Sequence, residues 1–289
     1  MKVVVTGATG FVAGHLLPAL TEAGHGVVAL AHEPDRLGAP PGVLVIEADL
    51  RRPLDRGAIG PVDSVVHLAQ ANVPFPDGAR DLWRVNAQST AELLELAKEA
   101  GASRFVLASS GSIYGLGHGA VAEDDPRRAT DFYAVTKRAA ELVVGAYAPY
   151  MHTAVLRLFT PYGPRQTGRL VPSLVDRIRS GRPVTLNAGG RPRLTPVFVL
   201  DLVRVVLAAL EREGNHVVNV AGDEVVGIQK LAQLIGEAVG REPVFEEKDG
   251  DAPGDLIGVN ARMHELYAPG PLVPLAEGIR ATVEADALA

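Results

Sequence analysis

The chain has 289 residues, of which 47% are hydrophobic, so it can form one large domain or two connected lobes and is not a disordered chain. Its formal charge of −6 at pH 7 argues against nucleic acid and anionic membranes as partners, because the average surface would repel their phosphates. It contains no cysteine, which excludes disulfides, thiolate nucleophiles and thiolate metal ligands, and we expect no metal site.

The first predicted element is a strand at the N-terminus. Val3 to Val5 form a β-branched run that is typical of a strand buried on both faces of a parallel sheet. Gly7 and Gly10 interrupt this run, and from Phe11 to Leu20 apolar residues recur at helical spacing. A helix N-terminus offers unpaired backbone N–H groups to an anion, so the turn is a candidate phosphate cradle. The alternative is an ordinary glycine-rich turn between a strand and a helix.

The opening apolar run is too short for the core of a signal peptide. No stretch of about eighteen unbroken apolar residues follows, which is the length that a membrane-spanning helix needs. We therefore expect a soluble, cytoplasmic protein with no membrane partner.

The second predicted strand, Val27 to Ala31, ends where a dinucleotide fold binds the ribose of its cofactor. An acidic residue there favours NAD, whereas Arg or Lys there accommodates the 2′-phosphate of NADP. Ala31 has no polar group, His32 could donate to a phosphate and Glu33 could accept from a hydroxyl, with Arg36 one turn further on. The other reading of this segment is a solvated loop.

Three more strands and a helix follow in the predicted order of an α/β fold. Val43 to Glu47 and Ser64 to Leu68 end in small or polar residues at the carboxyl edge of the sheet, where α/β proteins bind ligands. The helix after them carries Asn86 among its apolar residues, where it is either buried with a partner or facing solvent. The fifth strand, Arg104 to Ala108, delivers the sequence SSGSIYG to the same edge.

The next predicted helix, capped by Thr130 or Asp131, carries Tyr133 and Lys137 four residues apart. On one helix face the ammonium lies close to the phenol and lowers its pKa towards a value useful for proton transfer near neutral pH. The hydroxyl of Ser110 could bind the same substrate oxygen. Such a pair is usually a surface pair, but its occurrence with the serine and the glycine turn favours a catalytic role.

The second half of the chain leaves the sheet and returns to it. We predict strands at His152 to Leu158 and His216 to Gly222, and a smaller α+β region. The predicted fold is a doubly wound parallel Rossmann sheet of about seven strands with a smaller C-terminal α+β substrate lobe. Its predicted domains are residues 1–165 with 196–222, which bind the dinucleotide, and residues 166–195 with 223–289, which bind the substrate.

Several motifs resemble, in order, the signature blocks of the extended short-chain dehydrogenase/reductases, the NAD-dependent epimerase/dehydratase group. They are TGATGFVAGHL, HLA, SSGSIYG, YAVTK, RLFTPYGPRQ, TPVFVLDL and VNVAGDEVVGIQKLAQLIGEAVGREP followed by PGD. The resemblance covers nearly the whole chain. It implies a Rossmann domain, a smaller substrate lobe and a nucleoside-diphosphate sugar as substrate.

The same resemblance implies a role for each matching residue. Tyr133 would transfer the proton, Lys137 would lower its pKa and bind the nicotinamide ribose, and Ser110 would polarise the reacting oxygen. The other expected cofactor-binding residues are Gly7, Gly10, Phe11, Val12, His32, Asp49, Leu50, Leu68, Ala69, Gln70 and Asn86. The expected substrate-binding residues are Ser110, Ser112, Thr160, Arg193 and Arg262.

Four departures from the family pattern bear on the reaction. Ala13 replaces the third turn glycine, and Ala31 stands where NAD-dependent members usually have an Asp. Gly111 and Ser112 replace the Asp-Glu with which the family's dehydratases remove water, which disfavours dehydration. Thr160 occupies a position where many members have Asn.

We therefore predict an NAD(P)-dependent oxidoreductase that transfers a hydride at a ring carbon, C4, of a nucleotide-linked sugar. The favoured activity is a nucleotide-sugar 4-epimerase with NAD rather than NADP as cofactor. One alternative is an NADPH-dependent nucleotide-4-keto-sugar reductase, and another is a non-catalytic NAD(P)-binding sensor, against which the catalytic trio argues. Because relatives often dimerise through the helices that hold Asn86 and Tyr133, we expect a homodimer.

Overall fold

The computed structural model describes residues 1–55, 57, 59–248, 250 and 254–287. Pro253 of the PGD motif and residues 288–289 at the end of the predicted C-terminal lobe lie outside the described residues. The chain divides into two compact units. Unit 1 comprises Met1–Ile113, Arg127–Arg157 and Val203–Val218, and unit 2 comprises Tyr114–Pro126, Leu158–Leu202 and Asn219–Ala289. The predicted domain boundaries stay a prediction.

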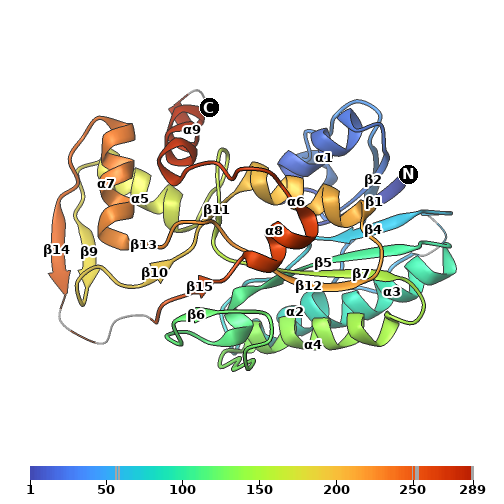
Figure 1. Ribbon diagram of the computed structural model, residues 1–289. Coiled ribbons are helices and arrows are strands. Elements are labelled where there is room, and N and C mark those ends of the chain that lie inside the picture. Colours follow the sequence, from blue (N-terminus) through green and yellow to red (C-terminus); the bar gives the residue numbers. More distant parts are fainter. Residues whose placement is uncertain (56, 58, 249, 251–253, 288–289) are drawn as a thin grey trace. The chain divides into compact units, whose positions relative to one another are not determined.

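A seven-stranded sheet forms the centre of the Rossmann fold, with the strand order β12-β7-β5-β4-β1-β2-β3 (Figure 1). Its strands are β1 (Lys2–Thr6), β2 (Gly26–Ala31), β3 (Leu44–Glu47), β4 (Ser64–His67), β5 (Arg104–Ser110), β7 (His152–Leu158) and β12 (Asn215–Val220). β1 pairs in parallel with β2 and β4, and β4 pairs in parallel with β5. The predicted doubly wound parallel sheet is confirmed.

Helices cover both faces of this sheet, with α1 on one face and α3 and α4 on the other (Figure 1). The helices of unit 1, with α6, which crosses the unit boundary, are α1 (Ala13–Glu22), α2 (Ala79–Trp83), α3 (Ser89–Glu99), α4 (Phe132–Tyr147) and α6 (Val199–Glu211). α1 begins two residues after Phe11, where its apolar periodicity starts, because the glycine turn extends to Val12. Among the described residues, no helix is both long enough and apolar enough to cross a bilayer.

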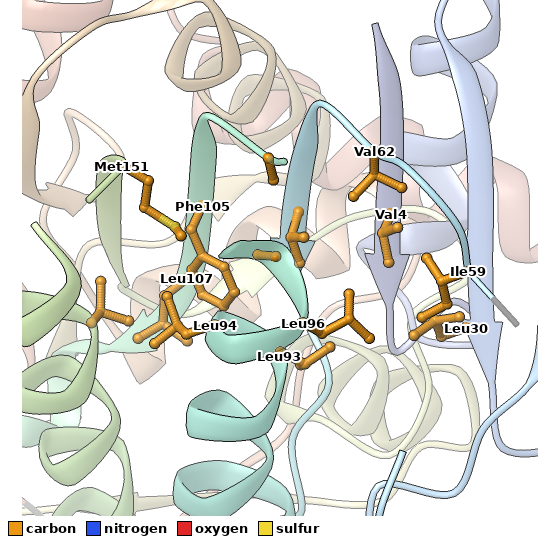
Figure 2. Close-up of a cluster of buried hydrophobic side chains, with 14 of the residues drawn as sticks. Val4, Leu30, Ile59, Val62, Leu93, Leu94, Leu96, Phe105, Leu107 and Met151 are labelled. Carbon is orange, nitrogen blue, oxygen red and sulfur yellow. The ribbon is translucent and has the colours of Figure 1, made fainter. Parts of the chain in front are cut away.

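The core of unit 1 lies between the sheet and the helices α3 and α4. The β-branched and aromatic residues of the strands supply one side, and the apolar stripe of α3 supplies the other. Figure 2 shows part of this cluster, with Val4, Leu30, Ile59, Val62, Leu93, Leu94, Leu96, Phe105, Leu107 and Met151 labelled. This packing fixes the carboxyl ends of the central strands relative to α4.

The helix predicted around Asn86 is interrupted. Between α2 and α3 the residues Arg84–Gln88 form a π-helical turn, labelled η3, which continues directly into α3. A π turn holds one more residue than an α-helical turn and is frequent at functional sites. The apolar spacing on either side of the turn predicts a helix but does not reveal the extra residue.

Unit 2 combines helices with short two-stranded sheets. Its helices are α5 (Leu170–Arg179), α7 (Ile228–Val239), α8 (Ala261–Tyr267) and α9 (Leu275–Ala287). Its short strands are β6 (Ala120–Val121), β8 (Pro161–Tyr162), β9 (Val184–Asn187), β10 (Arg193–Leu194), β11 (Val197–Phe198), β13 (Val226–Gly227), β14 (Phe245–Lys248) and β15 (Ile257–Gly258). The apolar faces of α5, α7 and α9 meet in a core of their own.

Candidate active site

The glycine turn after β1 forms a close-fitting backbone cradle. Gly7 has a φ of +66°, and a Cβ there would lie 2.7 Å from the backbone N and Cα of Ala69. The N–H of Gly10 donates to the carbonyl of Gly7 at 2.8 Å, which closes the turn before α1 begins. Glycine is required because this conformation is rarely adopted by other residues and because the strand end beside it leaves no room. The turn thus fits the backbone approach that a dinucleotide pyrophosphate needs.

The end of β4 lies beside this cradle. The N–H of Ala69 donates to Oγ1 of Thr6 at 3.2 Å, so Ala69 is held against the end of β1. Leu68 and Gln70 flank Ala69 in the chain, so the expected wall beside the dinucleotide starts next to Gly7. His67 is the last residue of β4. Its ring is buried, and its Nδ1 lies 2.7 Å from Oγ1 of Thr6.

The buried ring of His67 makes the stability of the protein depend on pH. Burial, and next the charge of Lys137, lower the pKa of His67 from 6.5 to about 3. As the pH falls, the unfolded chain therefore binds this proton before the folded protein does. The contribution of His67 to the stability of the folded protein is complete above pH 6.5 and is lost as the pH falls towards 3. We expect this group to reduce the free energy of unfolding by about 1 kcal/mol for each pH unit between pH 6 and 4.

Urea unfolding at pH 6, 5 and 4 measures this slope. His67→Gln, which keeps hydrogen-bonding groups near Thr6, should flatten it, whereas His118→Gln on an exposed loop should leave it unchanged. Equal slopes for the wild type and His67→Gln would contradict the assignment.

Tyr133 and Lys137 lie on α4, whose N-terminus is capped by the side chain of Asp131, which accepts from the N–H of Ala134 at 2.8 Å. The hydroxyl of Tyr133 donates to Oε1 of Gln70 at 2.7 Å, so the phenol reaches the strand end beside the glycine turn. Lys137 is buried, and its Nζ donates to the carbonyl of Ala108 on β5. Burial lowers the pKa of Lys137 from 10.5 to about 8. The depressed pKa that we expect for Tyr133 stays a prediction.

Ser110 is the last residue of β5, and the next four residues form the short helix η4 (Gly111–Tyr114). The hydroxyl oxygens of Ser110 and Ser112 lie 2.9 Å apart, and the N–H of Ser112 also donates to the Ser110 oxygen at 3.2 Å. The two serines expected to bind substrate are thus brought together at the strand end that follows the Ala108 carbonyl.

Asn86 points inward from the π turn and is 1% exposed, so the solvent-facing alternative is wrong. Its Oδ1 accepts from the N–H of Ala71 at 2.7 Å, and its Nδ2 donates to the carbonyl of the same residue at 3.0 Å. Nδ2 also donates to Oγ1 of Thr136 on α4 at 3.0 Å. Asn86 therefore ties the loop after β4 to the helix that carries Tyr133 and Lys137.

The ends of β2 and β3 carry a paired group of charges. Ala31 is buried and offers no polar side chain, whereas His32 lies 3.7 Å from the carboxylate of Asp49 and contacts the guanidinium of Arg51. Arg51 donates to both oxygens of Asp49, at 2.9 and 3.0 Å, and this hydrogen bonding lowers the pKa of Asp49. Leu50, between these two residues, is buried.

The remaining candidates, Thr160, Arg193 and Arg262, belong to unit 2. Arg193 donates from Nε and from a terminal nitrogen to Oδ2 of Asp255, at 2.9 and 2.8 Å. Burial opposes the charge of Asp255, but the hydrogen bonds from Arg193 outweigh it and lower the pKa of Asp255. Arg262 donates to Asp124 at 2.8 Å. Both arginines are therefore held in place by carboxylates. About half of the Arg193 side chain and about a third of the Arg262 side chain are exposed.

Residues 3–221 match the NAD dependent epimerase/dehydratase family. The chain belongs to this family. The resemblance carried by its motifs is confirmed.

Relatives in this family span several reactions. The chain is 27% identical to "Uncharacterized UDP-glucose epimerase YtcB" of Bacillus subtilis, over 96% of both chains. It is 30% identical to a dTDP-4-dehydro-6-deoxy-D-allose reductase of a Streptomyces species, over 93% of this chain and 92% of the relative. The crystal structure of UDP-glucuronic acid 4-epimerase from Bacillus cereus, in complex with UDP-glucuronic acid and NAD, superposes with a TM-score of 0.89 at 26% identity over all of both chains. The chain is thus an enzyme of the epimerase/dehydratase family, and the sensor alternative is set aside.

Two arginines of the enzyme were not among the sequence candidates. Arg51 joins the charges at the end of β3, and Arg191 lies 3.4 Å from Asp255 beside Arg193. Arg51 directly follows the Asp49-Leu50 pair, which is a signal that the sequence offers. The pairing of Arg191 and Arg193 with Asp255 joins residues more than 60 positions apart and has no local signal.

Thr160 is strained in the enzyme. Its φ is +45°, a left-handed conformation that β-branched residues rarely adopt and that Asn adopts several times more often. We expect Thr160→Asn to raise the free energy of unfolding by about 0.5–1 kcal/mol, measured by thermal unfolding. Thr185→Asn in β9 is the control and should be destabilising, since Thr suits a strand and Asn does not. A lower melting temperature for Thr160→Asn would contradict the strain.

Proposed function

We propose that the enzyme is an NAD-dependent nucleotide-sugar 4-epimerase that acts on a UDP-linked hexose or hexuronic acid. The observation that carries the proposal is the placement of Tyr133 and Lys137 on one helix, with the phenol bonded to Gln70 beside the glycine turn. The UDP-glucuronic acid 4-epimerase with NAD and the UDP-glucose epimerase relative support the substrate class.

Each catalytic residue has a distinct part in this proposal. Bound NAD would accept a hydride from C4 of the sugar and return it to the opposite face. Tyr133 takes the proton from the C4 hydroxyl as that carbon is oxidised and gives it back on reduction. The ammonium of Lys137 stabilises the phenolate, and the Ser110 hydroxyl donates to the same substrate oxygen.

The residues around the trio hold the dinucleotide and the sugar nucleotide. The backbone of Gly7, Gly10, Phe11 and Val12 cradles the pyrophosphate, and the wall of Leu68, Ala69 and Gln70 flanks it. Asp49 and Leu50 contact the adenine, and His32 lies at the ribose. Thr160, Ser112, Arg193 and Arg262 bind the substrate, with the two arginines at its pyrophosphate.

The second candidate is an NADPH-dependent 4-keto-sugar reductase. It is favoured by the end of β2, where Ala31 supplies no carboxylate and Arg51 lies against His32. An arginine in this place suits a 2′-phosphate. The reductase relative from Streptomyces also supports it.

Identification of the dinucleotide that is released when the enzyme is denatured tests the proposal. An epimerase returns its cofactor to the starting state in every cycle, so we expect NAD to be released. The native enzyme should convert UDP-glucuronic acid or UDP-glucose to its C4 epimer, followed by proton NMR, without added cofactor. Consumption of NADPH with a 4-keto sugar, and no epimer, would instead favour the reductase. If the protein binds dinucleotide but shows neither epimerase nor reductase activity, both candidate functions are wrong.

We propose that the enzyme is a homodimer, as relatives often are. Exposed apolar side chains on α2 and α4 support this, since Trp83 is 47% and Leu142 is 60% exposed. Sedimentation equilibrium should give twice the mass of the chain. A cytoplasmic location stays a prediction.

A further inference from the structure

A buried ion pair lies one helical turn beyond Lys137. Glu141 of α4 accepts from Nε of Arg157 at 3.0 Å and from a terminal nitrogen of the same side chain at 2.8 Å. The side chains of Arg157 and Glu141 are 1% and 3% exposed. Burial of such a bidentate pair carries a large desolvation free energy, and removal of one partner would leave a buried charge uncompensated.

The pair is connected to the strand that carries Ser110. The hydroxyl of Ser109 donates to Oε1 of Glu141 at 2.6 Å, and Ser109 itself is buried. Lys137 reaches the preceding residue of the same strand through the carbonyl of Ala108. Two successive turns of α4 therefore bind two successive residues of β5, immediately before Ser110.

Three elements meet at Glu141: α4 with Tyr133 and Lys137, β5 with Ser110, and β7 through Arg157. We infer that Glu141, held by Arg157 and Ser109, is a positioning residue that sets the place and the charge of the Lys137 ammonium against the end of β5. The inference rests on the proposed function of Lys137 and assigns Glu141 and Arg157 a part in it.

The titratable and charged groups around Lys137 lie on three elements, and Glu141 and His67 are the ones that interact with its charge. Tyr133, Arg138 and Glu141 share its helix, His67 lies on β4 and Arg157 on β7. Burial disfavours the ammonium, and Glu141 is the group that counteracts burial, since it raises the pKa of Lys137. Loss of the Glu141 charge should therefore release the proton of Lys137 at lower pH.

The test uses the full chain and reads Lys137 directly. The chain has five lysines, so the ¹³Cε signals of lysine-labelled protein can be assigned with Lys137→Arg and followed against pH. In Glu141→Gln, which keeps the shape and removes the charge, we expect the titration midpoint of Lys137 to fall by about one pH unit. The basic limb of kcat should move to lower pH in parallel, with kcat at its optimum reduced about tenfold and KM within about twofold.

Arg138→Gln is the matched control. Arg138 also donates to Glu141, at 3.1 Å, but its side chain is 33% exposed, so its loss should leave the midpoint and kcat close to those of the wild type. If Glu141→Gln does not fold, Glu141→Gln/Arg157→Gln also removes the buried guanidinium that would lose its partner, and it should also lower the midpoint.

An unchanged midpoint and an unchanged basic limb in a folded variant would overturn the inference and leave the pair a structural one. The NMR titration does not need turnover. If the wild type fails to epimerise any nucleotide sugar, the proposed function fails, while the shift of the Lys137 midpoint still decides the role of Glu141.

Discussion

Replacement of Tyr133 by phenylalanine is expected to lower kcat of epimerisation by about 10²–10⁴-fold, because the only group removed is the hydroxyl that carries the proton. The phenol also donates to Gln70 at 2.7 Å, at a partly exposed position. Loss of that bond should change the free energy of unfolding by about 1 kcal/mol or less. The large loss of activity and the small loss of stability separate catalysis from folding.

Tyr150→Phe is the control for this experiment. Tyr150 lies three residues after the end of α4 and is 63% exposed, and its variant should turn over at the wild-type rate. Epimer formation is followed by proton NMR, dinucleotide affinity by equilibrium dialysis and folding by circular dichroism. Turnover of Tyr133→Phe within tenfold of the wild type, with dinucleotide bound normally, would show that another group moves the proton.

Gly7→Ala is expected to destabilise the protein by about 2–4 kcal/mol and to weaken dinucleotide binding more than about tenfold. The left-handed conformation accounts for part of this cost. The rest arises because the new Cβ would meet the backbone N and Cα of Ala69 at 2.7 Å, and backbone cannot move aside as a flexible side chain can. Displacement of Ala69 would also move Gln70, the partner of Tyr133.

Gly14→Ala provides a matched control seven residues later. Gly14 lies in α1, and a Cβ there would meet no atom within 4 Å beyond its chain neighbours and the backbone of its own helix. Alanine favours a helix over glycine, so this variant should be stabilised by up to about 1 kcal/mol and should bind dinucleotide as the wild type does. Thermal unfolding and equilibrium dialysis measure both variants. A Gly7→Ala protein as stable and as tightly binding as Gly14→Ala would show that the turn tolerates a side chain.

Local patterns in the sequence predict much of the fold. The apolar runs that begin at Val3 and Val27 predict β1 and β2 within a residue, and the strand predicted from His152 to Leu158 has the bounds of β7. Such elements follow from short-range periodicity and from glycines. The carboxyl ends of parallel strands then bring the candidates of unit 1 to one edge of the sheet.

What the sequence could not predict depends on contacts between distant segments. Asn86 is bonded to Ala71 and Thr136, 15 and 50 positions away, and nothing near it in the chain distinguishes burial from exposure. The pairing of Glu141 with Arg157 and Ser109 likewise needs three elements in place. Ion pairs of this kind are properties of the assembled sheet rather than of any window of residues.

The π turn at Arg84–Gln88 affects how this chain aligns with its homologues. A π turn is a single-residue insertion into a helix, and the flanking turns of α2 and α3 keep their faces towards the core. A homologue lacking one residue here could keep both flanks buried while losing the inward-pointing Asn86. In an alignment, a gap of one position in this helix therefore marks a homologue that keeps the fold but lacks the link that Asn86 makes between the loop at Ala71 and α4.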